Sequence, residues 1–209
     1  MPVADRRRRL PPFLIAIAVV VGLVGTACGD DGSAAGLRGI VRTPAPDVSG
    51  LSLPDVTADG AEFVFEAADG EVLLVYFGYT SCPDVCPTTM TDIQRAIGRL
   101  DAGDADRVSL AMATIDPARD TADVLTGYVR SFVPDGHALV TTDDTRLRAV
   151  ADAFGASYGS ELDDAGEPEV FHTGFLYAVD DEGRLAITWP FGVTTDDYEH
   201  DLRLLLDRA

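Results

Sequence analysis

Lysine is absent from the sequence, and basic residues of any kind are scarce. All 16 basic residues are arginines, against 35 acidic residues, which gives a formal net charge of -19 at pH 7. Four of the arginines lie at positions 6–9, so the rest of the chain is still more acidic. Because an acidic surface repels the phosphate backbone of nucleic acids, the composition argues against nucleic-acid binding.

Cysteine and histidine are also rare, with three of each in the 209 residues. Only Cys82 and Cys86 are close together in the sequence, and two cysteines cannot supply a cluster that needs four cysteine ligands. Any third ligand that joins these two thiols at a metal ion therefore has to be of another type. The imidazole donors of the chain are limited to His137, His172 and His200.

Long apolar runs are missing too: the longest, residues 13–24, is shorter than the roughly 18–20 residues of a membrane-spanning helix. Arginines precede this run and the small residues 25–27 follow it, which is the order of a secretory signal. Cys28 then resembles the lipidated cysteine of a bacterial lipobox, with Gly25 where leucine is usual. The alternative is an uncleaved N-terminal anchor helix. Both interpretations place the folded part outside the cytoplasm, where thiols can be oxidised.

We therefore expect a signal peptide over residues 1–27, a lipid-anchored flexible tether over 28–40, and one folded domain over 41–209. The tether is rich in glycine, alanine and aspartate and has no apolar pattern. The protein is expected at the extracytoplasmic face of the cell membrane, held there through the lipid on Cys28.

Strand and helix patterns alternate along the folded part. Residues 72–77 (VLLVYF) are an uninterrupted run of strand formers, typical of a central strand buried on both faces. A short β-hairpin is expected within residues 37–66, further strands at 108–115, 138–140, 175–179 and 184–189, helices at 88–100, 121–132, 143–154 and 196–207, and an acidic loop at 161–169. This order predicts an α/β, thioredoxin-like fold with an N-terminal β-hairpin and a central mixed sheet flanked by helices.

Cys82 and Cys86 lie in the segment between the central strand and the next helix. If that helix begins near Val85, the four-residue spacing brings the two sulfurs together at its first turn. Unpaired N–H groups at a helix start are expected to lower the pKa of the thiols. Such a pair can close a disulfide or hold a soft metal ion such as Cu(I).

His172 is the histidine expected to complete a copper site. It lies just before the strand at 175–179, and in a thioredoxin-like sheet that connection faces the loop that carries the two cysteines. Imidazole suits copper and adds one nitrogen to two sulfurs. His137 and His200 are interpreted as surface residues, the first in a turn and the second in the last helix.

Two carboxylates are candidates for a supporting role around the metal. Asp116 ends the strand next to the cysteine-bearing strand, and Asp84 lies between the two cysteines. Either is expected to orient His172 or to balance the copper charge. The alternative for Asp116 is a simple capping or turn role in the Asp-Pro pair.

Three segments of the chain resemble the signature of the Sco/SenC family of copper proteins. They are residues 76–87 (YFGYTSCPDVCP), residues 116–121 (DPARDT) and residues 171–173 (FHT), within a similarity that runs from about Pro44 to the C-terminus. The resemblance implies a thioredoxin-like fold, binding of Cu(I) and Cu(II) at Cys82, Cys86 and His172, and a role in cytochrome c oxidase assembly. The implied partner is subunit II of the oxidase, with its binuclear copper centre, or an assembly factor. Phe171 departs from the family, which often has aspartate there.

Two other functions remain open from the sequence. The chain is alternatively a thiol–disulfide oxidoreductase, with Cys82 and Cys86 as the redox pair and copper binding incidental. A peroxiredoxin-like peroxidase is the weaker alternative, because the typical Thr-x-x-Cys loop is not found at residues 79–86. His172 separates the first two functions, since a reductase needs only the two thiols and a copper carrier needs the third ligand.

Overall fold

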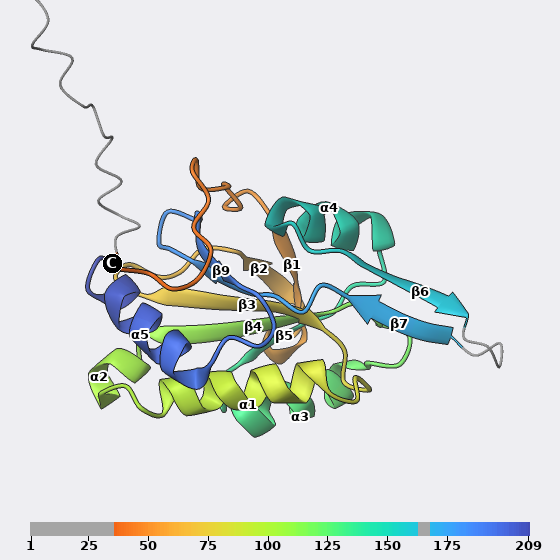
Figure 1. The fold of residues 1–209 in the computed structure, drawn as a ribbon. Coiled ribbons are helices and arrows are strands. Elements are labelled where there is room, and N and C mark those ends of the chain that lie inside the picture. Colours follow the sequence, from red (N-terminus) through yellow and green to blue (C-terminus); the bar gives the residue numbers. More distant parts are fainter. Residues whose placement is uncertain (1–35, 163–167) are drawn as a thin grey trace, which may run out of the picture. The chain divides into compact units, whose positions relative to one another are not determined.

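The computed structural model describes residues 36–162 and 168–209. A seven-stranded mixed sheet runs through the molecule in the order β2-β1-β5-β4-β3-β8-β9 (Figure 1). Its strands are β1 (Ser52–Asp55), β2 (Ala61–Val64), β3 (Val72–Gly78), β4 (Val108–Thr114), β5 (His137–Leu139), β8 (Leu176–Val179) and β9 (Leu185–Trp189). The predicted mixed sheet and the N-terminal hairpin, formed by β1 and β2, are both confirmed.

All seven residues of β3 are buried, as expected for a central strand. This strand pairs in parallel with β4 and antiparallel with β8. Its side chains alternate between the two faces of the sheet, so that Phe77 packs against Phe154 on one face. Tyr76 and Gly78 point to the other face, where an added Cβ on Gly78 would meet the sulfur of Cys86.

Helices cover both faces of the sheet. Figure 1 shows α1 and α3 on one side and α4 on the other. The helices are η1 (Val56–Ala58), α1 (Val85–Ile97), α2 (Ala102–Ala105), α3 (Ala122–Phe132), α4 (Asp144–Phe154) and α5 (Thr195–Leu206). The single turn of α2 has too few residues for a periodic pattern, so the sequence does not reveal it.

The N-terminus of α5 differs from the expectation. Thr194, and not Asp196, is the N-cap, and its hydroxyl accepts a hydrogen bond from the backbone N–H of Asp197. The Asp197 carboxylate bonds back to the N–H of Thr194 and completes a capping box. Threonine and aspartate are both good caps, and the reciprocal bond from the third helical residue selects Thr194.

The expectation of a loop over residues 161–169 is wrong at both ends. β6 (Tyr158–Leu162) and β7 (Pro168–His172) form a separate two-stranded antiparallel sheet, which Figure 1 shows extending away from the main sheet. Gly159 lies opposite Phe171 in this hairpin, and the missing glycine side chain leaves room for the phenylalanine ring. This cross-strand pair favours a strand where the acidic composition alone indicates a loop.

His137 is partly exposed, but it lies in a strand and not in the expected turn. It begins β5, its side chain is 35% exposed, and its Nδ1 lies 2.7 Å from the carboxylate of the buried Asp55. Burial alone would raise the pKa of Asp55, but hydrogen bonds from Thr57 and His137 outweigh burial and lower it. The pair therefore joins the N-terminal hairpin to β5, away from the cysteines. His200 lies in α5, where its Nε2 contacts the backbone oxygen of Gly36.

The predicted signal peptide, Cys28 and residues 28–35 of the predicted tether lie outside the described residues. Further along the tether, the backbone N–H groups of Arg38 and Gly39 both donate to the buried carboxylate of Asp201. This contact attaches the end of the tether to α5. No helix among the described residues is both long enough and apolar enough to cross a membrane.

Candidate metal centre

The two cysteines lie where the central strand passes into the first helix. β3 ends at Gly78 and α1 begins at Val85, so Cys82 lies in the connecting loop and Cys86 in the first helical turn. The backbone N–H of Cys86 donates to the sulfur of Cys82 at 3.3 Å. Cys86 is fully buried and Cys82 is 9% exposed, and both are free thiols. The helix start near Val85 therefore brings the thiols together as expected.

His172, at the end of β7, completes a group of three potential ligands. Its Nε2 lies 3.4 Å from the sulfur of Cys86, and the ligand atoms of Cys82, Cys86 and His172 all lie within 4.8 Å of one another. Donors that share an ion at about 2.0–2.3 Å lie no more than about 4.6 Å apart. Small movements are therefore enough for the three to bind one ion. Their role as ligands stays a prediction.

The imidazole of His172 is held in the neutral, metal-binding form. Burial lowers its pKa, which leaves the ring uncharged at neutral pH. Nδ1 lies 3.2 Å from the backbone oxygen of Thr173, and the tautomer with its proton on Nδ1 donates to this oxygen and leaves the Nε2 lone pair for a metal ion. The rings of Tyr76 and Tyr79 meet the imidazole edge to face, with centroids 6.0 and 5.8 Å away.

The expected lowering of the thiol pKa is wrong for Cys86. Burial raises the pKa of this thiol to about 12, although its contacts with the Tyr79 backbone and the Tyr76 side chain act in the opposite direction. Removal from water thus outweighs the helix start, because the charged thiolate loses its solvation. Cys86 is protonated at neutral pH in the metal-free chain. A metal ion that binds there has to displace this proton, so binding strengthens as the pH rises.

The two candidate carboxylates are not part of the three-residue group. Asp84 is exposed at the N-cap of α1, where its side chain makes no capping hydrogen bond. Asp116 forms an ion pair with Arg119. The contact of His172 Nδ1 is the backbone oxygen of Thr173, not a carboxylate. A role of Asp116 or Asp84 in balancing the copper charge stays a prediction.

Gly78, which lies in the family-like segment, also shapes this centre, although it is not among the residues predicted to do so. An ideal Cβ at this position would lie 2.7 Å from Cε1 of Tyr76 and 3.0 Å from the sulfur of Cys86. Only glycine leaves the space that the Cys86 sulfur occupies. The sequence contains one indication of this role, because a glycine in a strand often marks a site where another group approaches the backbone closely.

Gly78→Ala is expected to weaken copper binding about tenfold or more, because the added methyl group displaces the Cys86 sulfur. Overpacking should also lower the free energy of unfolding by about 1–3 kcal/mol. Gly127→Ala is the matched control: this glycine lies within α3 and has no heavy atom within 4 Å of an added Cβ. The free energy of unfolding of Gly127→Ala should rise by about 0.5–1 kcal/mol, and its copper affinity should equal that of the wild type. Competition with a chelator measures the copper affinity of each variant, and chemical denaturation measures its free energy of unfolding. Wild-type copper affinity in Gly78→Ala would contradict this role of Gly78.

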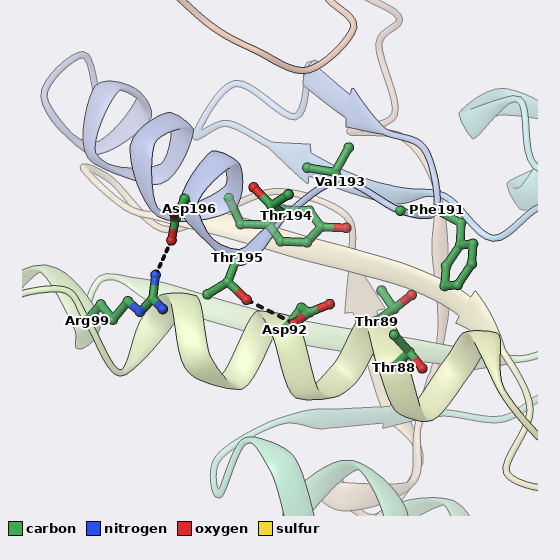
Figure 2. Close-up of a pocket in the computed structure, with 11 residues that line it drawn as sticks. Thr88, Thr89, Asp92, Arg99, Phe191, Val193, Thr194, Thr195 and Asp196 are labelled. Carbon is green, nitrogen blue, oxygen red and sulfur yellow. Dashed lines mark hydrogen bonds and ion pairs between the residues drawn. The ribbon is translucent and has the colours of Figure 1, made fainter.

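A groove lies next to this centre, between α1 and the segment that leads into α5 (Figure 2). Thr88 and Thr89, which follow Cys86 in α1, line it together with Phe191. At its other end the groove is lined by Arg99 and Asp196, which form an ion pair (Figure 2). None of the three potential ligands lines the groove, so the metal centre is a separate feature of this surface.

The donor set limits the ions that suit the centre. Two thiolates and one neutral imidazole are soft and borderline ligands, which suit Cu(I) and Zn²⁺ and not hard cations such as Mg²⁺ or Ca²⁺. Within the described ranges, no further cysteine, histidine or carboxylate joins the group. A trigonal copper site needs three donors, so the residues present fit that ion without addition.

A family model described as SCO1/SenC matches residues 54–207. The chain belongs to the SCO1/SenC family. The sequence resemblance is thereby confirmed, and the matched range contains all three potential ligands. An SCO2-like protein of Rickettsia prowazekii is 32% identical over 131 residues, which cover 62% of this chain and 63% of that protein. The chain spans about three fifths of the length of the curated relatives it matches first.

Solved structures support the same fold. The copper-bound structure of Bradyrhizobium japonicum ScoI is 27% identical, with a TM-score of 0.61, and the match covers 74% of this chain and 96% of that one. The structure of BsSco is 19% identical, with a TM-score of 0.60. BsSco is described as having a disulfide switch and as a member of the Sco family of cytochrome c oxidase assembly proteins. That match covers 81% of this chain and 99% of BsSco. The thioredoxin-like fold class is confirmed by these SCO1/SenC neighbours.

Proposed function

We propose that this SCO1/SenC chain is a copper metallochaperone that helps to assemble the binuclear copper centre of cytochrome c oxidase subunit II. The observation that carries the proposal is the convergence of two thiols and one neutral imidazole within 4.8 Å. The copper-bound Bradyrhizobium relative supports copper as the ion. The description of BsSco as a member of a family of oxidase assembly proteins supports the process.

The same residues allow two ways of acting on the partner. In the first, Cys82, Cys86 and His172 hold copper and release it to the ligands of the acceptor. In the second, the reduced pair gives two electrons and two protons to a disulfide of the acceptor, and a Cys82–Cys86 disulfide forms as the acceptor thiols are freed. The first requires His172, whereas the second requires only the thiols.

Electronic spectra of the Cu(II)-loaded chain test the ligand set. We expect a thiolate-to-Cu(II) charge-transfer band that disappears when both cysteines are replaced by serine. Metal analysis of the same sample should find copper after the reduced chain is offered equal amounts of copper and zinc. Zinc alone in the purified chain, or a copper spectrum without a thiolate band, would contradict the proposed function.

The location is part of the proposal and has its own test. The signal pattern and Cys28 support a lipid anchor that holds the domain at the extracytoplasmic face of the cell membrane. Cys28→Ala should release the chain from the membrane fraction or block its processing, as seen on fractionation and gel mobility. An unchanged membrane-bound product would favour the uncleaved anchor helix instead.

A further inference from the structure

A buried carboxylate lies next to the cysteine loop but outside the group of potential ligands. Asp120, in the turn between β4 and α3, is completely buried. Its Oδ1 accepts from the hydroxyl of Thr80 at 2.5 Å, and its Oδ2 accepts from the backbone N–H of Thr80 at 3.0 Å. The hydroxyl of Thr114 donates to the same Oδ2 at 2.6 Å. Asp120 thus connects the end of β4 with the loop that follows β3.

These bonds are a strong constraint because the carboxylate has lost all contact with water. Burial of a carboxylate is costly unless hydrogen bonds replace its solvation. Within the described chain, each hydrogen bond to the Asp120 side chain comes from a threonine. The neighbouring Arg119 pairs instead with Asp116 and lies over the ring of Tyr79. Movement of Thr80 would therefore leave the buried charge without two of its three donors.

The position of Thr80 allows its bonds with Asp120 to hold the backbone near the thiols. It lies two residues before Cys82, whose backbone N–H donates to the oxygen of Tyr79 at 3.3 Å. Cys86 belongs to α1, whose backbone is fixed by its own helical hydrogen bonds. A disulfide needs the sulfurs at about 2.05 Å. Because the helix is the more rigid element, any backbone adjustment that brings the sulfurs to this distance falls on the Cys82 loop.

We propose that Asp120 is a positioning residue for the dithiol: its carboxylate holds Thr80 and so keeps the Cys82 loop in the reduced, metal-accepting arrangement. The geometry stands without any metal, while its consequence for copper rests on the proposed function. Loss of the Asp120–Thr80 bridge favours the disulfide over the dithiol. It also weakens copper binding, because Cys82 is no longer held beside Cys86 and His172.

The test measures the equilibrium between the full chain and glutathione, in which the dithiol and oxidised glutathione yield the protein disulfide and two reduced glutathiones. Asp120→Asn removes the negative charge, so that the bonds with Thr80 are no longer charge-assisted. Thr80→Val removes the hydroxyl bond and keeps the shape of the side chain. Both should shift the equilibrium toward the disulfide by about tenfold or more. Thr80→Ser keeps the hydroxyl and should remain within about twofold of wild type.

Asp201→Asn is the matched control, because Asp201 is also completely buried. Its carboxylate accepts three hydrogen bonds, from the backbone of Arg38 and Gly39 and from the indole of Trp189. Its variant should lose stability to a similar extent and leave the glutathione equilibrium unchanged. An equal shift in Asp201→Asn, or none in Thr80→Val and Asp120→Asn, would overturn the role of Asp120.

Competition for Cu(I) with a chelator, on the same samples, separates the two proposals. Asp120→Asn and Thr80→Val should bind Cu(I) about tenfold or more weakly, whereas Thr80→Ser and Asp201→Asn should bind it like the wild type. If the wild-type chain binds no copper, the proposed function fails, and the glutathione equilibrium still decides the role of Asp120. If the wild type binds copper and Thr80→Val changes neither measurement, only the role of Asp120 is refuted.

Discussion

Oxidation of Cys82 and Cys86 to a disulfide should abolish copper binding by the purified chain, whereas the reduced chain should bind one copper ion. The described residues offer one group with two sulfurs and one imidazole nitrogen, so one site is expected. A disulfide removes both thiolates at once and leaves His172 as a lone donor. Metal analysis after gel filtration, with the thiols counted in the same sample, measures the stoichiometry in each state.

Substitution of one cysteine at a time measures how much each sulfur contributes to copper binding. Cys82→Ser and Cys86→Ser should each weaken Cu(I) binding by about 100-fold or more, since each removes one of three ligands. The comparison is best made in a Cys28→Ser background, in which intermolecular disulfides through the third cysteine cannot form. Copper bound by the oxidised chain as tightly as by the reduced chain would rule out the dithiol site.

Local pattern and topology explain why the sequence indicates which three side chains come together, while their role as ligands stays a prediction. The uninterrupted run before Gly78 indicates a buried strand, and the four-residue cysteine spacing then fixes where the thiols lie relative to the helix. The position of His172 follows from the thioredoxin-like topology: β8 pairs antiparallel with β3, so the segment before β8 lies at the same edge of the sheet as the loop after β3. These are features of local pattern and topology, which a single sequence contains.

What the sequence did not predict depends on packing between distant segments. The raised pKa of Cys86 follows from the complete burial of its side chain, and no local sequence pattern indicates this burial. The acidic composition of the β6–β7 hairpin indicated a loop. The pairing of Gly159 with Phe171 could not be predicted, because it depends on how the two strands are aligned. Asp120 lies in the family-like segment 116–121, but no local pattern indicates its bonds to Thr80, which cross forty positions of the chain.

His172→Ala should separate copper delivery from thiol reduction. Cu(II) affinity is expected to fall by about 10- to 100-fold, because Cu(II) favours nitrogen donors, while Cu(I) persists better on two thiolates. Cells that carry the variant should lose cytochrome oxidase activity in copper-limited medium and recover part of it when copper is added. Reduction of an oxidised partner peptide by the purified variant should be almost unchanged, because both thiols remain.

His200→Ala is the control for this comparison, since His200 contacts the backbone of Gly36 and not the thiols. It should behave like the wild type in copper binding, peptide reduction and oxidase activity. The decisive result comes from copper-limited cells. If His172→Ala supports full oxidase activity there while Cys82→Ser and Cys86→Ser do not, the thiols act by electron exchange alone. Copper delivery by this chain would then have to be abandoned, because a carrier without its only nitrogen ligand should fail first when copper is scarce.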